Sequence, residues 1–88
     1  MFFIFDEERP HGIWMKNMRF ALDIIFLNGQ KQVVAVKENA LPCKEDCPTF
    51  RPPVVSKYAL EVVAGFVSRH QVKVGDQANF LKKLLLIM

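Results

Sequence analysis

Two carboxylates lie inside otherwise apolar segments of this 88-residue chain. Asp23 stands within the run 22–26, and Glu61 stands within the run 57–63. A buried pair of acids can carry out general acid–base chemistry, because burial and a neighbouring negative charge raise the pKa of one member. An enzymatic function of this chain would therefore depend on Asp23 and Glu61.

A structural role is the alternative for both carboxylates. Burying an unpaired charge is costly, so each acid would cap a turn or pair with Lys16, Arg19 or Asn17. We expect Lys16 or Arg19 to neutralise at least one of the two acids. In that arrangement Glu61→Gln breaks a buried pair on one side and lowers the melting temperature.

A second candidate site is the segment Trp14-Met15-Lys16-Asn17, which holds the only tryptophan of the sequence. Ligand sites are mostly aromatic and apolar with a few placed polar groups, so this segment could line a groove. Trp14 as a core residue is the plainer interpretation, because large aromatic side chains dominate core energetics. The candidate ligand-binding residues are therefore Trp14, Lys16, Asn17, Asp23 and Glu61.

Cys43 and Cys47 form a C-x3-C pattern between two prolines. A tetrahedral zinc site needs four ligands, and neither His11 nor His70 has the spacing of a further ligand. A redox dithiol normally shows C-x-x-C at a helix start, which is absent here. We favour a structural disulfide over two free thiols without a function. Such a bond would imply export or a hyperthermophilic origin, because cytosolic disulfides are rare.

The composition and the missing motifs speak against several classes of function. The net charge is +3, and the 12 lysines and arginines are scattered, whereas nucleic-acid binders concentrate them on one face. The sequence shows no Gly-rich phosphate loop, no Ser/His/Asp or Cys/His signature, and no kinase or nuclease motif. We expect no cofactor and no metal, and nucleic acid is not an expected partner.

Short strands must position the candidate residues. Apolar runs predict a fully buried strand at 2–5, a strand at 12–16, and two strands at 23–27 and 32–37 joined by Asn28-Gly29. Asn-Gly is typical of a type I′ hairpin turn, in which both central residues have positive φ. Alternating faces predict one further strand over 57–63.

The remaining segments contain turn and loop signals. Four prolines between residues 38 and 55 exclude a central strand or long helix there, so we expect one irregular excursion pinned by the cysteines and Phe50. Gly65 ends the strand before it, residues 66–71 can form one or two helical turns, and Gly75-Asp76 marks a turn. The expected fold is all-β, a small barrel or sandwich of short strands with at most one short helix.

The length allows one domain, which we place at residues 1–80, followed by an apolar tail at residues 81–88. Exposed apolar patches mark interfaces, so we expect the tail to pack, either in a homodimer or within its own chain. No run reaches the roughly 20 residues that span a bilayer. Residues 1–5 lack the basic start of a secretory signal, so a cytoplasmic location is the default expectation.

The order of several motifs carries a family resemblance. They are Phe2-Phe3-Ile4-Phe5, Trp14-Met15-Lys16-Asn17, Leu22-Asp23-Ile24-Ile25-Phe26, Pro42-Cys43 with Cys47-Pro48, Leu60-Glu61 before Ala64-Gly65, and Gly75-Asp76. Together they resemble the uncharacterised bacterial and archaeal family called domain of unknown function 192. The chain departs from the family pattern at Met18 and Ala21, at its tail, and by starting inside the domain. The resemblance implies a compact, mostly β fold and supplies no catalytic residues.

Two functional classes follow from these observations. The first is a non-enzymatic binding or interaction module for an unknown small ligand or protein, with residues 14–17 and the proline–cysteine loop as its surface. The alternative is a small enzyme that uses Asp23 and Glu61. The absence of a nucleophile–base pair and of cofactor motifs favours the module. Two carboxylates that converge on one open cleft would favour the enzyme.

Overall fold

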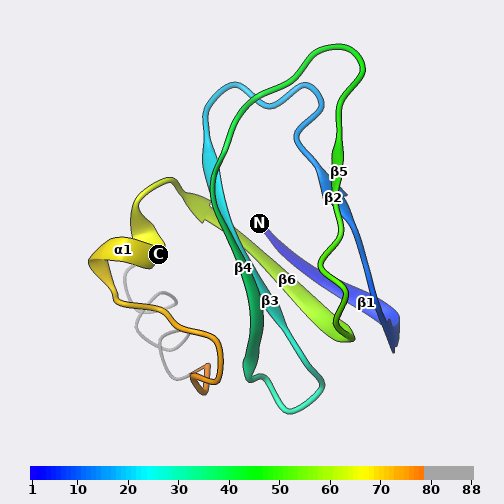
Figure 1. Cartoon of the computed structure of the whole chain (residues 1–88), viewed down its shortest axis with the longest axis vertical. Coiled ribbons are helices and arrows are strands. Elements are labelled where there is room, and N and C mark those ends of the chain that lie inside the picture. Colours follow the sequence, from blue (N-terminus) through cyan, green and yellow to red (C-terminus); the bar gives the residue numbers. More distant parts are fainter. Residues whose placement is uncertain (79–88) are drawn as a thin grey trace.

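The computed structural model describes residues 1–78, which form six strands and one short helix (Figure 1). The elements in chain order are β1 (Phe2–Arg9), β2 (Ile13–Trp14), β3 (Leu22–Leu27), β4 (Val33–Ala40), β5 (Thr49–Phe50), β6 (Ser56–Val63) and α1 (Phe66–Arg69). The predicted all-β fold with one short helix is confirmed. The predicted apolar tail and its packing lie outside the described residues.

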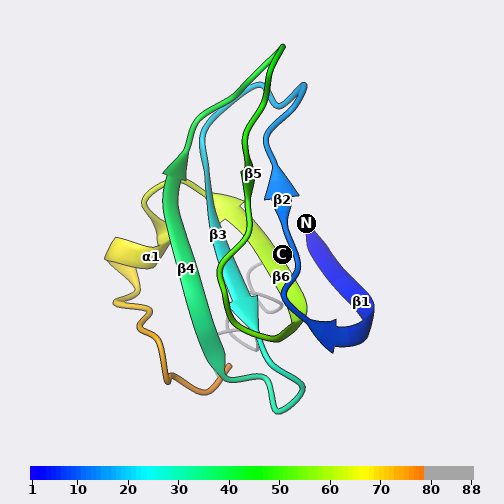
Figure 2. The same cartoon turned by 45° about the vertical axis from the view of Figure 1, so that its right-hand side comes forward.

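The strands form two separate antiparallel sheets. The larger sheet has the order β1-β6-β3-β4, and the smaller one pairs β2 with β5. As far as residue 78, neither sheet closes into a barrel. Figure 2 shows β2 and β5 running alongside the larger sheet, with α1 at its other side. This layering places the central strands β3 and β6 between two sets of covering elements.

The core lies on both faces of β3, whose six residues are all buried. On one face Ile25 and Leu27 belong to a cluster that includes the helix residues Phe66 and Val67. On the opposite face lies a second cluster, which draws on β2, β5 and their flanks; its buried members are Met15, Leu22, Ile24, Phe26, Ala40 and Ala59. A strand that is covered on both faces carries apolar side chains on both. In β3 the exception is Asp23.

The β3–β4 hairpin is confirmed, but its turn is not the predicted type I′ turn. Lys31 is the turn residue with positive φ, at 61°, while Gly29 has an ordinary φ. The Asn28 side chain accepts hydrogen bonds from the backbone N–H groups of Gln30 and Gln32, at 3.0 and 2.9 Å. Asn28 therefore stabilises a longer turn through its side chain, which is the other common use of asparagine in turns.

Strand β1 is not the fully buried strand that its apolar run predicts. It lies at the edge of the larger sheet, and among residues 1–78 the elements that cover it lie on one face (Figures 1 and 2). Phe3 and Phe5 pack against the second cluster, whereas Phe2 and Ile4 are 42% and 67% exposed. The apolar run cannot reveal this, because an edge strand and a central strand can share one pattern.

The prediction of a wholly irregular excursion over residues 38–55 is wrong at two points. Strand β4 continues to Ala40, and Thr49 and Phe50 form the short strand β5. Both fit the chemistry of proline, because β4 ends before Pro42 and β5 begins after Pro48. Within residues 1–78, no helix is long and apolar enough to cross a membrane.

Candidate functional site

Asp23 is buried in β3, and its carboxylate accepts three backbone hydrogen bonds from distant parts of the chain. Oδ1 accepts from the N–H of Asn39 at 2.8 Å. Oδ2 accepts from the N–H groups of Gly65 at 3.1 Å and Val67 at 3.0 Å. The first N–H groups of a helix have no partner within it, and Asp23 supplies one for α1. Asp23 therefore connects β3 to β4 and to the start of α1.

The sequence predicts that Lys16 or Arg19 neutralises at least one of Asp23 and Glu61, and for Asp23 the structure shows a different arrangement. Backbone amides occupy both oxygens of its carboxylate, and neither basic side chain is among its partners. Charge-assisted hydrogen bonds from backbone N–H groups can stabilise a buried carboxylate without a counter-ion. The contacts of the Asp23 carboxylate are backbone hydrogen bonds that join β3 to β4 and α1, in place of the expected ion pair.

Glu61 is buried on β6, 8% exposed. Burial raises the pKa of its carboxyl above the ordinary value of 4.5, and the positive N-terminus of Met1 opposes part of this rise. Its backbone is paired with Met1 through two hydrogen bonds, Met1 N–H to Glu61 O at 2.8 Å and Glu61 N–H to Met1 O at 2.7 Å. A buried acid with a raised pKa carries its proton more readily than a solvated one.

Asp23 and Glu61 do not converge on one cleft. In the β3–β6 ladder Asp23 is opposite Val62, and Glu61 is opposite Ile24. Directly opposed residues share a face, and successive residues alternate, so the two carboxylates leave the sheet on opposite faces. Asp23 faces α1, and Glu61 is on the side of the second cluster. The arrangement lacks the paired carboxylates that the enzymatic alternative needs.

Trp14 is 53% exposed, so its interpretation as a core residue is wrong. The buried residue of this segment is its neighbour Met15, 6% exposed, which belongs to the second cluster together with Ile13. Alternation along an extended chain explains the difference, because Ile13 and Met15 face the larger sheet and Trp14 points away. The Lys16 amine lies 5.2 Å from the centroid of the Trp14 ring, within the range of a cation–π contact.

Backbone hydrogen bonds join this segment to the cysteine loop. Cys43 donates its N–H to the carbonyl of Met15 at 3.2 Å, and Asn17 donates its N–H to the carbonyl of Cys43 at 2.9 Å. Asn17 has a φ of 65°, a left-handed conformation that asparagine tolerates better than most residues. Cys43 is bonded to Cys47 by a disulfide, with 5.6 Å between the Cα atoms. The structure thus brings three predicted residues together with both cysteines: Trp14, Lys16 and Asn17.

Two exposed apolar residues that the sequence did not single out lie at the same end of the molecule. Phe20 is 62% exposed and Leu41 is 66% exposed. Phe20 precedes β3 and Leu41 follows β4, at the end where Leu22 is paired with Ala40. We call the exposed residues of this end the cysteine-loop surface: Trp14, Lys16, Asn17, Phe20 and Leu41. The signal in the sequence for Phe20 and Leu41 is that each is an apolar residue in a loop next to an apolar strand.

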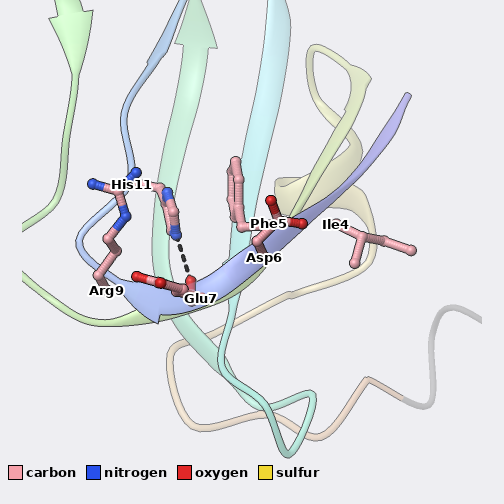
Figure 3. A pocket seen from close by; sticks show the side chains of 6 residues that line it. All are labelled: Ile4, Phe5, Asp6, Glu7, Arg9 and His11. Carbon is pink, nitrogen blue, oxygen red and sulfur yellow. Dashed lines mark hydrogen bonds between the residues drawn. The ribbon is translucent and has the colours of Figure 1, made fainter.

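An open pocket of about 420 Å³ lies along β1 and the segment that follows it (Figure 3). Its lining residues are Ile4, Phe5, Asp6, Glu7, Arg9 and His11. His11 is buried, its ring is stacked 3.8 Å from that of Phe5, and its Nε2 lies 2.7 Å from the carbonyl oxygen of Glu7. A carbonyl only accepts, so Nε2 carries the hydrogen. In the sequence, His11 is of interest only as a possible zinc ligand. Within residues 1–78 no group of three or more His, Cys, Asp or Glu side chains could hold a metal.

Comparison with known proteins identifies relatives of uncertain activity. Two solved bacterial structures are similar to this chain: a proposed transcription regulator from Sinorhizobium meliloti 1021, with 36% identity and a TM-score of 0.80, and a protein of unknown function from Novosphingobium aromaticivorans DSM 12444, with 30% identity and a TM-score of 0.74. Each comparison covers 88% of this chain, which spans 58% and 54% of the respective relatives. No curated protein matches the sequence.

A family model settles the relationship that the motifs of the sequence suggest. The model named DUF192 and described as "Uncharacterized ACR" matches residues 1–80. This range takes in Trp14-Met15-Lys16-Asn17, the Leu22-Asp23 motif and the cysteine loop. The chain belongs to the family of domain of unknown function 192.

Proposed function

We propose that this chain is a non-enzymatic binding module whose binding surface is the cysteine-loop surface. The observation that carries the proposal is the exposure of Trp14, the only tryptophan, on a segment held by backbone hydrogen bonds and placed beside a disulfide. A large aromatic side chain that is exposed on a rigid support loses little conformational entropy when it binds. Exposed apolar side chains are typical of interaction sites, and Phe20 and Leu41 are exposed at the same end of the molecule.

The charge beside Trp14 indicates which ligands this surface would favour. The amine of Lys16 lies over the ring face, and the exposed side chains of Arg19 and Lys44 come from the same two loops. An apolar group could pack against Trp14 while an attached carboxylate meets the amine of Lys16. The ligand class we propose is therefore an anion with an aromatic or aliphatic body, either free or as part of a protein.

The description of one of the two relatives raises the question of DNA as a partner. One is described as a proposed transcription regulator, and this chain spans 58% of its length. The scattered basic residues of this chain and its net charge of +3 give no strong support for DNA as the partner. The Cys43–Cys47 disulfide favours an oxidising compartment over the cytoplasm as the location of this protein, because disulfides persist mainly outside the cytosol.

Phenylacetate and its neutral analogue phenylacetamide test the proposal. In a titration followed by NMR, we expect phenylacetate to shift the amide signals of residues 14–20 and 41–44, and to bind more tightly than phenylacetamide. Trp14→Ala should abolish the signal shifts caused by phenylacetate and those caused by phenylacetamide. Lys16→Gln should remove the preference for the anion while leaving the weak response to phenylacetamide.

The matched control is Val74→Ala, since Val74 is 65% exposed and lies far along the chain from this surface. It should bind phenylacetate as the parent does. Shifts that spread evenly over the protein, or that persist in Trp14→Ala, would contradict the proposed surface. A duplex DNA of mixed sequence is the third probe, and binding of DNA through these residues would contradict the ligand class.

A further inference from the structure

Among residues 1–78, no strand pairs with the outer edge of β1, so one row of its backbone groups has no partner strand there. Met1 and Glu61 exchange both of their hydrogen bonds, N–H to O at 2.8 and 2.7 Å. Hydrogen-bonded and non-hydrogen-bonded pairs alternate in an antiparallel ladder, so Phe3 is bonded to Ala59 while Phe2 and Ile4 are not bonded across to β6. The N–H and C=O groups of Phe2 and Ile4 therefore point to the free edge of the sheet.

The side chains at this edge are apolar and exposed. Phe2 is 42% and Ile4 is 67% exposed, and Phe2 stacks on Tyr58 with 5.5 Å between ring centroids. Native proteins protect their edge strands with charges, bulges or covering elements. In β1 the charged residues begin at Asp6, and the register shift falls between Ile4 and Arg9. These features protect the second half of the strand, and within the described part of the chain no strand pairs with the outer edge of residues 1–5.

We propose that residues 1–5, which are Met1 and the first four residues of β1, pair antiparallel with the same residues of a second copy of this chain. Phe3 lies on the two-fold axis, opposite Phe3 of the second copy. Phe2 of each copy then exchanges two backbone hydrogen bonds with Ile4 of the other. The two four-stranded sheets become one continuous sheet across the axis.

The sequence of the edge favours a second copy over an unrelated strand. Residues 1–5 read Met-Phe-Phe-Ile-Phe, which remains apolar at every position when it is reversed. An antiparallel pair centred on Phe3 therefore places apolar side chains opposite apolar side chains along its whole length. It also sets Asp6 of each copy beyond Met1 of the other, so the acidic segments lie at opposite ends and like charges are kept apart. This interface is independent of the cysteine-loop surface.

The mass of the protein in solution, measured by sedimentation equilibrium over a range of concentrations, tests the pairing. We expect the mass of the parent to rise with concentration from that of one chain to that of two chains. Ile4→Pro should stay at the mass of one chain, because proline removes the outward N–H of Ile4 without removing a bond to β6. Ile4→Lys should do the same by placing a charge at the interface, and it decides the question if the proline variant fails to fold.

Val74→Lys is the matched control, because Val74 is 65% exposed, close to the value for Ile4. It should dimerise as the parent does. Hydrogen exchange supplies a second measurement, since the amides of Phe2 and Ile4 should exchange more slowly as the parent concentration rises. A parent that stays at the mass of one chain up to high micromolar concentration overturns the proposal. A dimer that survives both Ile4 substitutions also overturns it, including a dimer formed through residues 81–88.

Discussion

Asp23 and Glu61 occupy adjacent strands one register position apart, and their side chains leave the sheet on opposite faces. Asp23 is opposite Val62, and Glu61 is opposite Ile24. The first carboxylate accepts hydrogen bonds from three backbone amides, and burial raises the pKa of the second. Two acids that look equivalent in the sequence therefore differ in environment, and they should respond differently to mutation.

Replacement of Asp23 should destabilise the protein strongly. Asp23→Asn turns one carboxylate oxygen into an amide donor facing backbone N–H groups, and a buried group left unpaired costs about 1–3 kcal/mol. We expect a loss of at least about 2 kcal/mol in the free energy of unfolding, measured by urea denaturation. The amides of Gly65 and Val67 should also exchange faster with solvent. Glu38→Gln, which changes an exposed acid on β4, is the control.

Equal stability of Asp23→Asn and Glu38→Gln would mean that the hydrogen bonds of Asp23 to Asn39, Gly65 and Val67 contribute nothing to folding. That result would contradict the structural role assigned to Asp23.

Glu61→Gln should raise the melting temperature near neutral pH, the reverse of the expectation from the sequence. The folded pKa of Glu61 lies above the unfolded value of about 4.5, so between these two values the folded state binds more protons than the unfolded state. The contribution of Glu61 to stability is therefore present below about pH 4.5 and is lost as pH rises through the folded pKa. Melting curves at about pH 4 and about pH 8 measure this change.

The parent and Glu61→Gln should be similar at the acidic end, and the variant should be the more stable at the alkaline end. A variant that melts below the parent at the alkaline end would show that the ionised Glu61 carboxylate makes a favourable contact. In that case the original ion-pair hypothesis would regain support.

Gly12→Ala should disturb the pairing of β2 with β5. A Cβ atom at this position meets the Cγ2 of Thr49 and lies 2.9 Å from the Nε of Arg51. Overpacking of this kind typically costs about 1–3 kcal/mol. We expect the variant to be less stable by that amount, with a shift in the fluorescence of Trp14.

Gly29→Ala is the control for this substitution. The atoms that its Cβ meets belong to the carboxylate end of the Glu8 side chain, which can move aside. If Gly29→Ala loses as much stability as Gly12→Ala, the effect comes from the loss of glycine in general and not from the β2–β5 contact.

Removal of the disulfide should lower the free energy of unfolding and should loosen the cysteine-loop surface. Closure of a loop of about five residues restricts the unfolded chain by about 2 kcal/mol in the chain-entropy account. We expect Cys43→Ser/Cys47→Ser to lose about that much in urea denaturation. The intact mass of the parent should rise by about two hydrogens on reduction, as expected for one disulfide. Two thiols that alkylate freely in the unreduced native protein would contradict the bond.

The sequence by itself determined the class of the fold and most of its elements. Strand-length apolar runs, the prolines near both cysteines, and turn signals at Asn28 and Gly75 are local features, and local features decide where strands begin and end. The helix at Phe66–Arg69 lies within the predicted range for the same reason. The motifs between Phe2 and Asp76 also pointed to the family whose model matches residues 1–80.

Tertiary structure alone decided which side of each strand is covered. The run at residues 1–5 gave no sign that β1 lies at an edge, and Trp14 gave no sign that Met15 beside it is the buried residue. The partners of Asp23 are backbone amides 16, 42 and 44 residues away, which no local pattern can announce. Burial and long-range hydrogen bonds depend on which strands become neighbours, and this is set by packing of the whole chain rather than by any single segment.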